Sequence, residues 1–153
     1  RRYEINMQSV VLRNYSGLAF NENLQHSPDF DLFMRLASCS QVCVLKNNLV
    51  KYRKLANSLT SKNISIWWSE MKFTLDEIFL EDEKLKIDYK NEIDLAYAKV
   101  AYKKSEYLVS IGDMEKVRSE LMHYRCISMK YFILYISSFF PKVVWDFLHK
   151  YKI

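Results

Sequence analysis

The near absence of glycine is the feature that most constrains what this chain can fold into. Only 2 of the 153 residues are glycine and only 2 are proline, whereas glycine makes up about 7% of an average protein. Loops that cradle nucleotide phosphates need glycine where the backbone approaches phosphate closely. The composition therefore excludes a Rossmann-type or P-loop site made from these residues alone, and it favours long helices, whose interiors disfavour both residue types.

The charge and the cysteine content of the chain limit the kinds of partner that it can bind and indicate the cellular compartment in which it occurs. The chain has 23 basic and 18 acidic residues, a net charge of +5, and the basic residues are scattered except near the C-terminus. Duplex-DNA binders usually cluster their basic residues on one face, so we expect no nucleic-acid partner. Cys39, Cys43 and Cys126 are odd in number and form no CxxC pair. They predict neither a disulfide framework nor a zinc site, and they fit a reducing, cytoplasmic location.

The second part of the chain, residues 63–153, predicts helices only. Apolar residues recur at helical spacing over residues 64–80, 83–111 and 114–138. Gly112 stands where a helix-ending glycine belongs, Asp113 is a good N-cap, and Pro141 breaks the last helix. Residues 97–124 resemble one helix-turn-helix unit of a tetratricopeptide-type array. The amphipathic end, residues 139–153, predicts either contact with the inner face of a membrane or docking back onto the domain.

The first part, residues 1–62, predicts a mixture of strands and one helix. Residues 9–13, 41–45 and 49–53 are short runs rich in β-branched and apolar residues, which favour strands. Ser27 followed by Pro28 marks the start of a helix. The fold class expected for the whole chain is therefore α+β leaning mostly α, with three to four helices in the C-terminal part.

Four short motifs follow one another in the first part of the chain. They are INMQSVVLR at 5–13, GLAFNE at 17–22, DFDLFMRL at 29–36, and LVKYR at 49–53 with NSLT at 57–60. Together they resemble the acceptor half of family 2 glycosyltransferases, which have the GT-A fold. Pro28 stands where the family usually has glutamate, and Leu55 stands where it has histidine. The family's nucleotide-binding half and its D-x-D metal motif are not among these residues.

The resemblance implies a catalytic role for Asp29 as general base. It would take the proton of the acceptor hydroxyl while that oxygen attacks the anomeric carbon, and the nucleoside diphosphate would leave from the opposite face with inversion. A carboxylate at a helix N-terminus is favoured in its charged form. The alternative is a first-turn acid with a purely structural role. We read Asp31 as a residue that faces solvent or caps a loop rather than as part of a metal motif.

The resemblance also implies substrate contacts by Glu22, Asp31, Arg53 and Ser58. Arg53 and Ser58 would lie near the donor diphosphate, with a solvated loop as the alternative. Arg35 is expected to pair with Glu22 or Asp31. Among the aromatic residues of the helices, Trp67 and Trp68 are expected in the core rather than in a carbohydrate platform.

The resemblance implies that the chain is the acceptor side of an inverting glycosyltransferase. The complete enzyme would transfer a sugar from a nucleotide-sugar to a glycan or lipid-linked acceptor, in surface polysaccharide or lipooligosaccharide synthesis. The resemblance implies a divalent metal, Mg or Mn, in the complete enzyme, with ligands mainly outside these residues. The expected partners are the nucleotide-sugar donor and the glycan acceptor, and this chain alone is expected to be inactive. The alternative function is a non-catalytic helical protein-interaction module.

Overall fold

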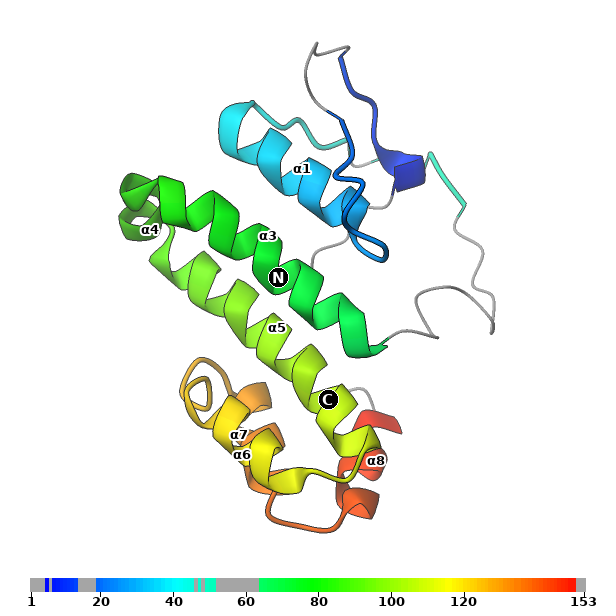
Figure 1. Ribbon diagram of the computed structural model, residues 1–153, viewed down its shortest axis with the longest axis vertical. Coiled ribbons are helices and arrows are strands. Elements are labelled where there is room, and N and C mark those ends of the chain that lie inside the picture. The colour runs from blue at the N-terminus through cyan, green and yellow to red at the C-terminus, as the bar shows by residue number, and fades with distance from the viewer. Residues whose placement is uncertain are drawn as a thin grey trace.

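The structure is a computed structural model that describes residues 5, 7–13, 19–45, 47, 49–51 and 64–150. Within these ranges every regular element is a helix (Figure 1). The elements are a 3-10 turn η1 (Met7–Ser9) and the α-helices α1 (Pro28–Cys39), α3 (Ile64–Glu81), α4 (Glu83–Asp88), α5 (Lys90–Ser110), α6 (Met114–Met122), α7 (Met129–Ser137) and α8 (Lys142–Lys150).

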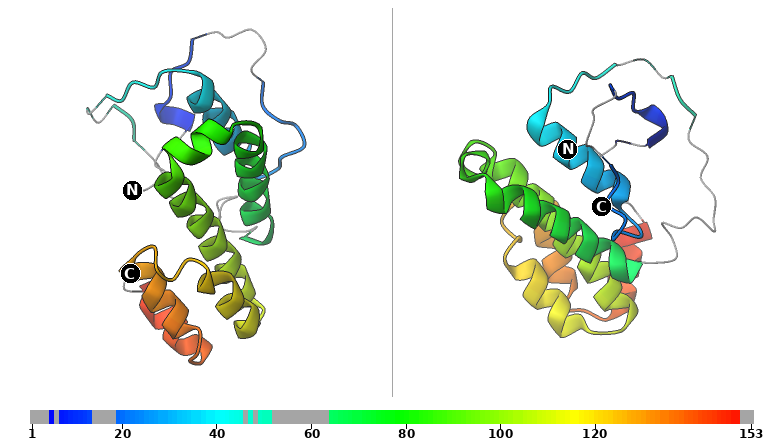
Figure 2. Two further views of the ribbon diagram at one scale, coloured as in Figure 1. Left: turned by 90° about the vertical axis from the view of Figure 1, so that its left-hand side faces the viewer. Right: turned by 45° about the horizontal axis from the view of Figure 1, so that its top comes forward.

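Two long helices form the frame of the molecule. Helices α3 and α5 run antiparallel side by side, and α4 turns the chain between them (Figures 1 and 2). Helix α1 packs on α3, and α6 folds back against α5. Helices α7 and α8 follow at the same end as α6. Among the described helices, each one contacts the next described helix along the chain.

The expected α+β class is wrong for the part of the chain that the structure describes. Residues 10–13, 41–45 and 49–51 have no regular secondary structure there, and residues 7–9 form η1 instead. Residues 52–53, the end of the third expected strand, lie outside the described ranges. A strand needs a neighbour to accept and donate its backbone hydrogen bonds, and none of these segments is paired in a sheet with another described residue. Most of their apolar side chains are exposed instead, with Val44 79% exposed and Leu45 71% exposed, whereas Val10 packs against side chains of α1.

The predicted helices are confirmed in position but two of them are divided. Helix α1 starts after Ser27 with proline at its first position, and α3 covers the predicted range. The helix expected over 83–111 breaks at Tyr89, which lets the chain turn from α4 into α5. The helix expected over 114–138 breaks at residues 123–128 into α6 and α7. Neither break has a glycine or a proline, the signals on which helix ends are usually predicted.

The core consists of neighbouring clusters that share helix α5. One lies between α1, α3 and α5 and contains Phe30, Met71, Leu75 and Val100, with Trp67 and Trp68 packed against it. This placement of the two tryptophans confirms the predicted core role. The other gathers side chains from the last four helices, among them Ala98, Leu108, Val109, Val117, Leu121, Tyr131, Leu134 and Trp145. A smaller group, Leu32, Phe33 and Leu36, packs with Val10 on the outer side of α1.

Candidate functional site at the start of helix α1

Asp29, the predicted general base, lies in the first turn of α1 and is half-buried. Its Oδ1 accepts the backbone N–H of Phe30 at 2.9 Å. This position places the carboxylate beside the free backbone N–H groups of the first helical turn. Its position leaves the carboxylate partly accessible, which a group that exchanges a proton with a substrate hydroxyl requires.

Glu70 of α3 holds the chain that leads into α1. Its Oε1 accepts the backbone N–H of Gln25 at 2.8 Å, and its Oε2 accepts those of His26 at 2.9 Å and Ser27 at 2.8 Å. The Ser27 hydroxyl also donates to Oε2 at 2.9 Å. Burial raises the pKa of the Glu70 carboxyl, but the hydrogen bonds from these three residues outweigh it and hold that pKa below its ordinary value.

Ser27 precedes α1 as predicted, but its side chain does not cap the helix. Its side chain makes no hydrogen bond to the first turn of α1 and turns to Glu70 instead. Glu70 contributes a full negative charge near the N-terminus of the helix, so it replaces the usual serine cap with a charged group from another element. This contact fixes the position of α1, and of Asp29 with it, relative to α3.

Asp31 has a different environment from Asp29. It is 3% exposed, and its Oδ2 accepts hydrogen bonds from Arg35 Nε at 2.9 Å and Nη2 at 2.7 Å. Its Oδ1 accepts the Thr74 hydroxyl at 3.2 Å. The expectation that Asp31 faces solvent is wrong, because pairing and hydrogen bonding compensate its burial. The predicted Arg35–Asp31 pair is confirmed.

Arg35 extends this connection to the loop before α1. Its Nη2 also donates to the carbonyl oxygen of Ala19 at 2.9 Å. Asp31, Arg35 and Thr74 thus tie together α1, α3 and the segment at residue 19, and their contacts are structural. A contact of Asp31 with substrate stays a prediction.

The other predicted site residues are only partly placed. Glu22 is exposed in the turn that precedes α1. Arg53 and Ser58 lie outside the described residues, as does Gly17 of the turn motif. The predicted substrate contacts of Glu22, Asp31, Arg53 and Ser58 therefore all stay predictions.

The part of the chain that the structure describes contains no set of side chains that could bind a metal ion. No group of three or more histidine, cysteine, aspartate or glutamate side chains converges there. His26 contributes its backbone N–H to Glu70. The described residues therefore do not supply a ligand set for the divalent metal that the resemblance implies, whose ligands are expected mainly outside them.

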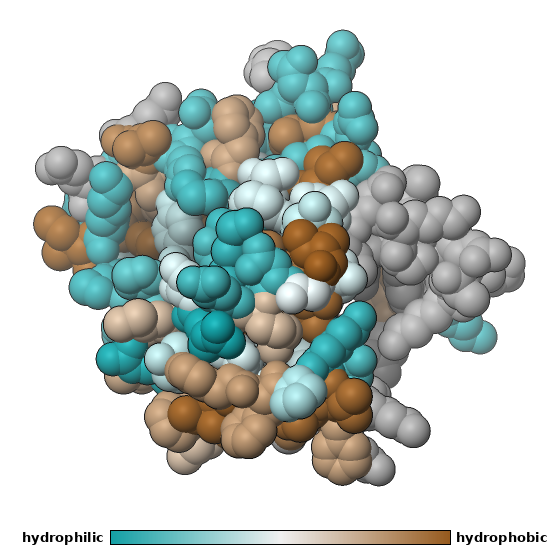
Figure 3. Space-filling view, turned by 60° about the horizontal axis from the view of Figure 1, so that its bottom comes forward, coloured by the Kyte–Doolittle hydropathy of each residue, from teal (hydrophilic) through white to brown (hydrophobic). Residues whose placement is uncertain are grey.

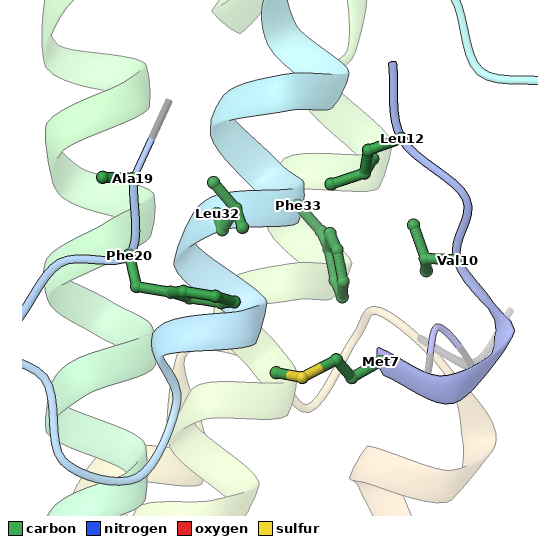
Figure 4. A pocket seen from close by; sticks show the side chains of 7 residues that line it. All are labelled: Met7, Val10, Leu12, Ala19, Phe20, Leu32 and Phe33. Carbon is green, nitrogen blue, oxygen red and sulfur yellow. The ribbon is translucent and has the colours of Figure 1, made fainter. Parts of the chain in front are cut away.

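An open apolar pocket of about 270 Å³ lies beside α1 but does not include the acidic residues. Figure 4 shows that its lining comes from η1, from residues 10–12 and 19–20, and from α1. The lining residues are Met7, Val10, Leu12, Ala19, Phe20, Leu32 and Phe33. The side chains that line the pocket are therefore all apolar.

Glu70 and Thr74 are the site residues that sequence reasoning missed. Both are buried, at 8% and 0% exposed, and they lie four positions apart, on the face of α3 that also carries Met71. The sequence did contain one indication of a role for Glu70, because an acid within the buried stripe of an amphipathic helix requires a hydrogen-bonding or charged partner. The sequence gives no means of placing that partner about 45 residues earlier in the chain.

Comparison with known proteins leaves the family open. No protein-family model, no curated protein and no solved structure matches the chain. Among the described residues, no helix is long and apolar enough to cross a membrane.

Proposed function

We propose that this chain is the acceptor side of an inverting glycosyltransferase, with Asp29 as the general base. The observation that carries the proposal is that the two carboxylates of the Asp29-Phe30-Asp31 motif lie in different environments. Asp31 is buried and held by Arg35 and Thr74. Asp29 remains half-buried at the positive end of α1. The Asp31 carboxylate thus has a structural role, and the partial exposure of Asp29 supports the proposal that its carboxylate contacts a substrate.

The proposed reaction is the transfer of a sugar to an acceptor hydroxyl. An acceptor hydroxyl donates a hydrogen bond to the Asp29 carboxylate, its oxygen attacks the anomeric carbon of the donor sugar, and Asp29 takes the proton. The bond from the anomeric carbon to the diphosphate breaks, and the diphosphate leaves with the electron pair from the opposite face. Glu70 keeps the start of α1 in place, so that Asp29 is oriented before the acceptor binds.

The proposal is tested in the complete enzyme with the variant Asp29→Asn. Loss of the base should lower sugar transfer from a nucleotide-sugar by about 10²–10⁴-fold, with the melting temperature unchanged, because Asp29 is only half-buried. Asp31→Asn is the matched control two positions away. It should lower the melting temperature, because it weakens the buried pair with Arg35. Transfer at the wild-type rate by Asp29→Asn would refute the assignment.

A second function, a helical protein-interaction module, is favoured by one observation. The segment after α1 exposes several large apolar side chains, namely Val42, Val44, Leu45, Leu49 and Val50. Apolar groups gathered in this way are typical of surfaces that bind another protein. A complete protein that shows no transfer to any acceptor, with or without Asp29, would favour this function over the first.

A further inference from the structure

The end of the molecule formed by α7 and α8 exposes a continuous set of apolar side chains. Figure 3, which brings the lower end of Figure 1 forward, shows a band of apolar side chains along its lower edge. Exposed apolar residues recur every three or four positions within α7, at Met129, Phe132 and Ile136, and within α8, at Val143 and Phe147, which places them on one side of each helix. We call this set the distal apolar face; it consists of Met129, Phe132, Ile136, Phe139, Phe140, Val143 and Phe147.

The distal apolar face is held in place by the core beneath it. Trp145 of α8 is 2% exposed and lies in the cluster shared by α5, α6 and α7. Arg118 of α6 donates to the carbonyl oxygen of Ser138 at 3.1 Å, and its guanidinium lies 5.4 Å from the ring centroid of Phe139. Helix α8 therefore docks on the domain through one side, while Val143, 76% exposed, is on the other.

The C-terminal part of the sequence differs in charge from the rest of the chain. Residues 121–153 contain five basic residues and one acidic residue, a net charge of +4. The remaining residues contain 18 basic and 17 acidic residues, a net charge of +1. Lys130 and Lys142 are both exposed and are next in sequence to Met129 and Val143 of the face. Apolar side chains with flanking cations match the interface of an anionic bilayer, where the apolar groups insert and the cations meet lipid phosphates.

We propose that the distal apolar face binds the surface of an anionic lipid bilayer. A second copy of the chain is the main alternative occupant, but pairing two such faces would bring two regions of +4 together, and this like-charge repulsion opposes a dimer. The inference rests on exposure and charge at α7 and α8, so it does not depend on the catalytic role of Asp29. It accounts for both outcomes expected for the C-terminal segment, because α8 docks on the domain and still presents an apolar side.

The test is vesicle flotation of the purified chain. Vesicles of phosphatidylcholine with phosphatidylglycerol are compared with vesicles of phosphatidylcholine alone. The wild-type chain should float with the anionic vesicles only, and added salt should weaken the binding. Val143→Asp should weaken it about tenfold or more. Aspartate in the first turn of a helix is favourable, so α8 should remain folded. Met129→Asp, in the first turn of α7, is a second variant of the same design.

The matched control is Val44→Asp. Val44 is 79% exposed and lies away from α7 and α8, so this variant makes the same change of charge and polarity at a similar exposure. It should float as the wild type does. Three results would overturn the proposal: no flotation of the wild-type chain, an equal loss in Val44→Asp, or a concentration-dependent dimer that Val143→Asp dissolves in the absence of vesicles.

Discussion

At the scale of single residues, Glu70 is the side chain on which the geometry of the candidate site depends most. Its two oxygens accept four hydrogen bonds from residues 25–27. Glu70→Gln keeps the size but replaces one acceptor with a donor that would face an N–H group. Hydrogen bonds to a charged group contribute about 1.5–3 kcal/mol each, so the free energy of unfolding should fall by about that amount or more. Urea denaturation of both proteins measures the difference, and an unchanged midpoint would contradict the role given to Glu70.

The lowered pKa of Glu70 also predicts a dependence on pH. Because the folded state holds the carboxyl below its ordinary value of 4.5, the stabilisation is fully present above that value and is lost as the pH falls through the folded pKa. The wild-type chain should therefore lose stability on acidification more steeply than Glu70→Gln. Melting temperatures of the two proteins from neutral pH down to below the ordinary value measure this. Parallel curves would show that the carboxylate makes no net contribution.

At the scale of elements, the sequence predicted helix ends that are set by adjacent residues, but it did not predict features that depend on contacts between distant residues. The start of α1 and the turn at Gly112 and Asp113 follow from residue types at adjacent positions, and both predictions are confirmed. The expected strands were wrong because apolar alternation shows only that a segment is suited to a strand. Pairing with a neighbour is what makes it one. Likewise the sequence predicted Asp29 in the first turn of α1, but not Glu70, which reaches that turn from another helix.

Gly112 provides a test at this scale, because it ends α5 with φ of 83°. A Cβ added there would meet no atom within 4 Å, so Gly112→Ala should cost only the backbone strain of the left-handed conformation, about 1–2 kcal/mol. Gly112→Asn should cost less, because asparagine tolerates this conformation better. Thermal unfolding of the two variants checks the order. Equal melting temperatures for alanine and glycine would contradict the conformation assigned to the turn.

At the scale of the whole molecule, α5 links the two main clusters of the core. It contributes Val100 to the cluster with α1 and α3, and Ala98, Leu108 and Val109 to the cluster with the last three helices. A straight helix of 21 residues cannot lose its contacts on one side without weakening those on the other, since its backbone hydrogen bonds form cooperatively. The chain from 64 to 150 should thus unfold in one step, even though its N-terminal and C-terminal helices do not share a cluster.

Two core substitutions test this coupling. Leu75→Ala removes a fully buried side chain from the cluster with α1, and Leu121→Ala removes one from the cluster with α6 to α8. Each should lower the free energy of unfolding by about 2–5 kcal/mol and shift the whole transition. Leu80→Ala, at a position 70% exposed on α3, should change it little. Calorimetry together with circular dichroism and tryptophan fluorescence follows the unfolding. Separate transitions, one sensitive to Leu75→Ala and the other to Leu121→Ala, would show that α5 does not join the two clusters into one cooperative unit.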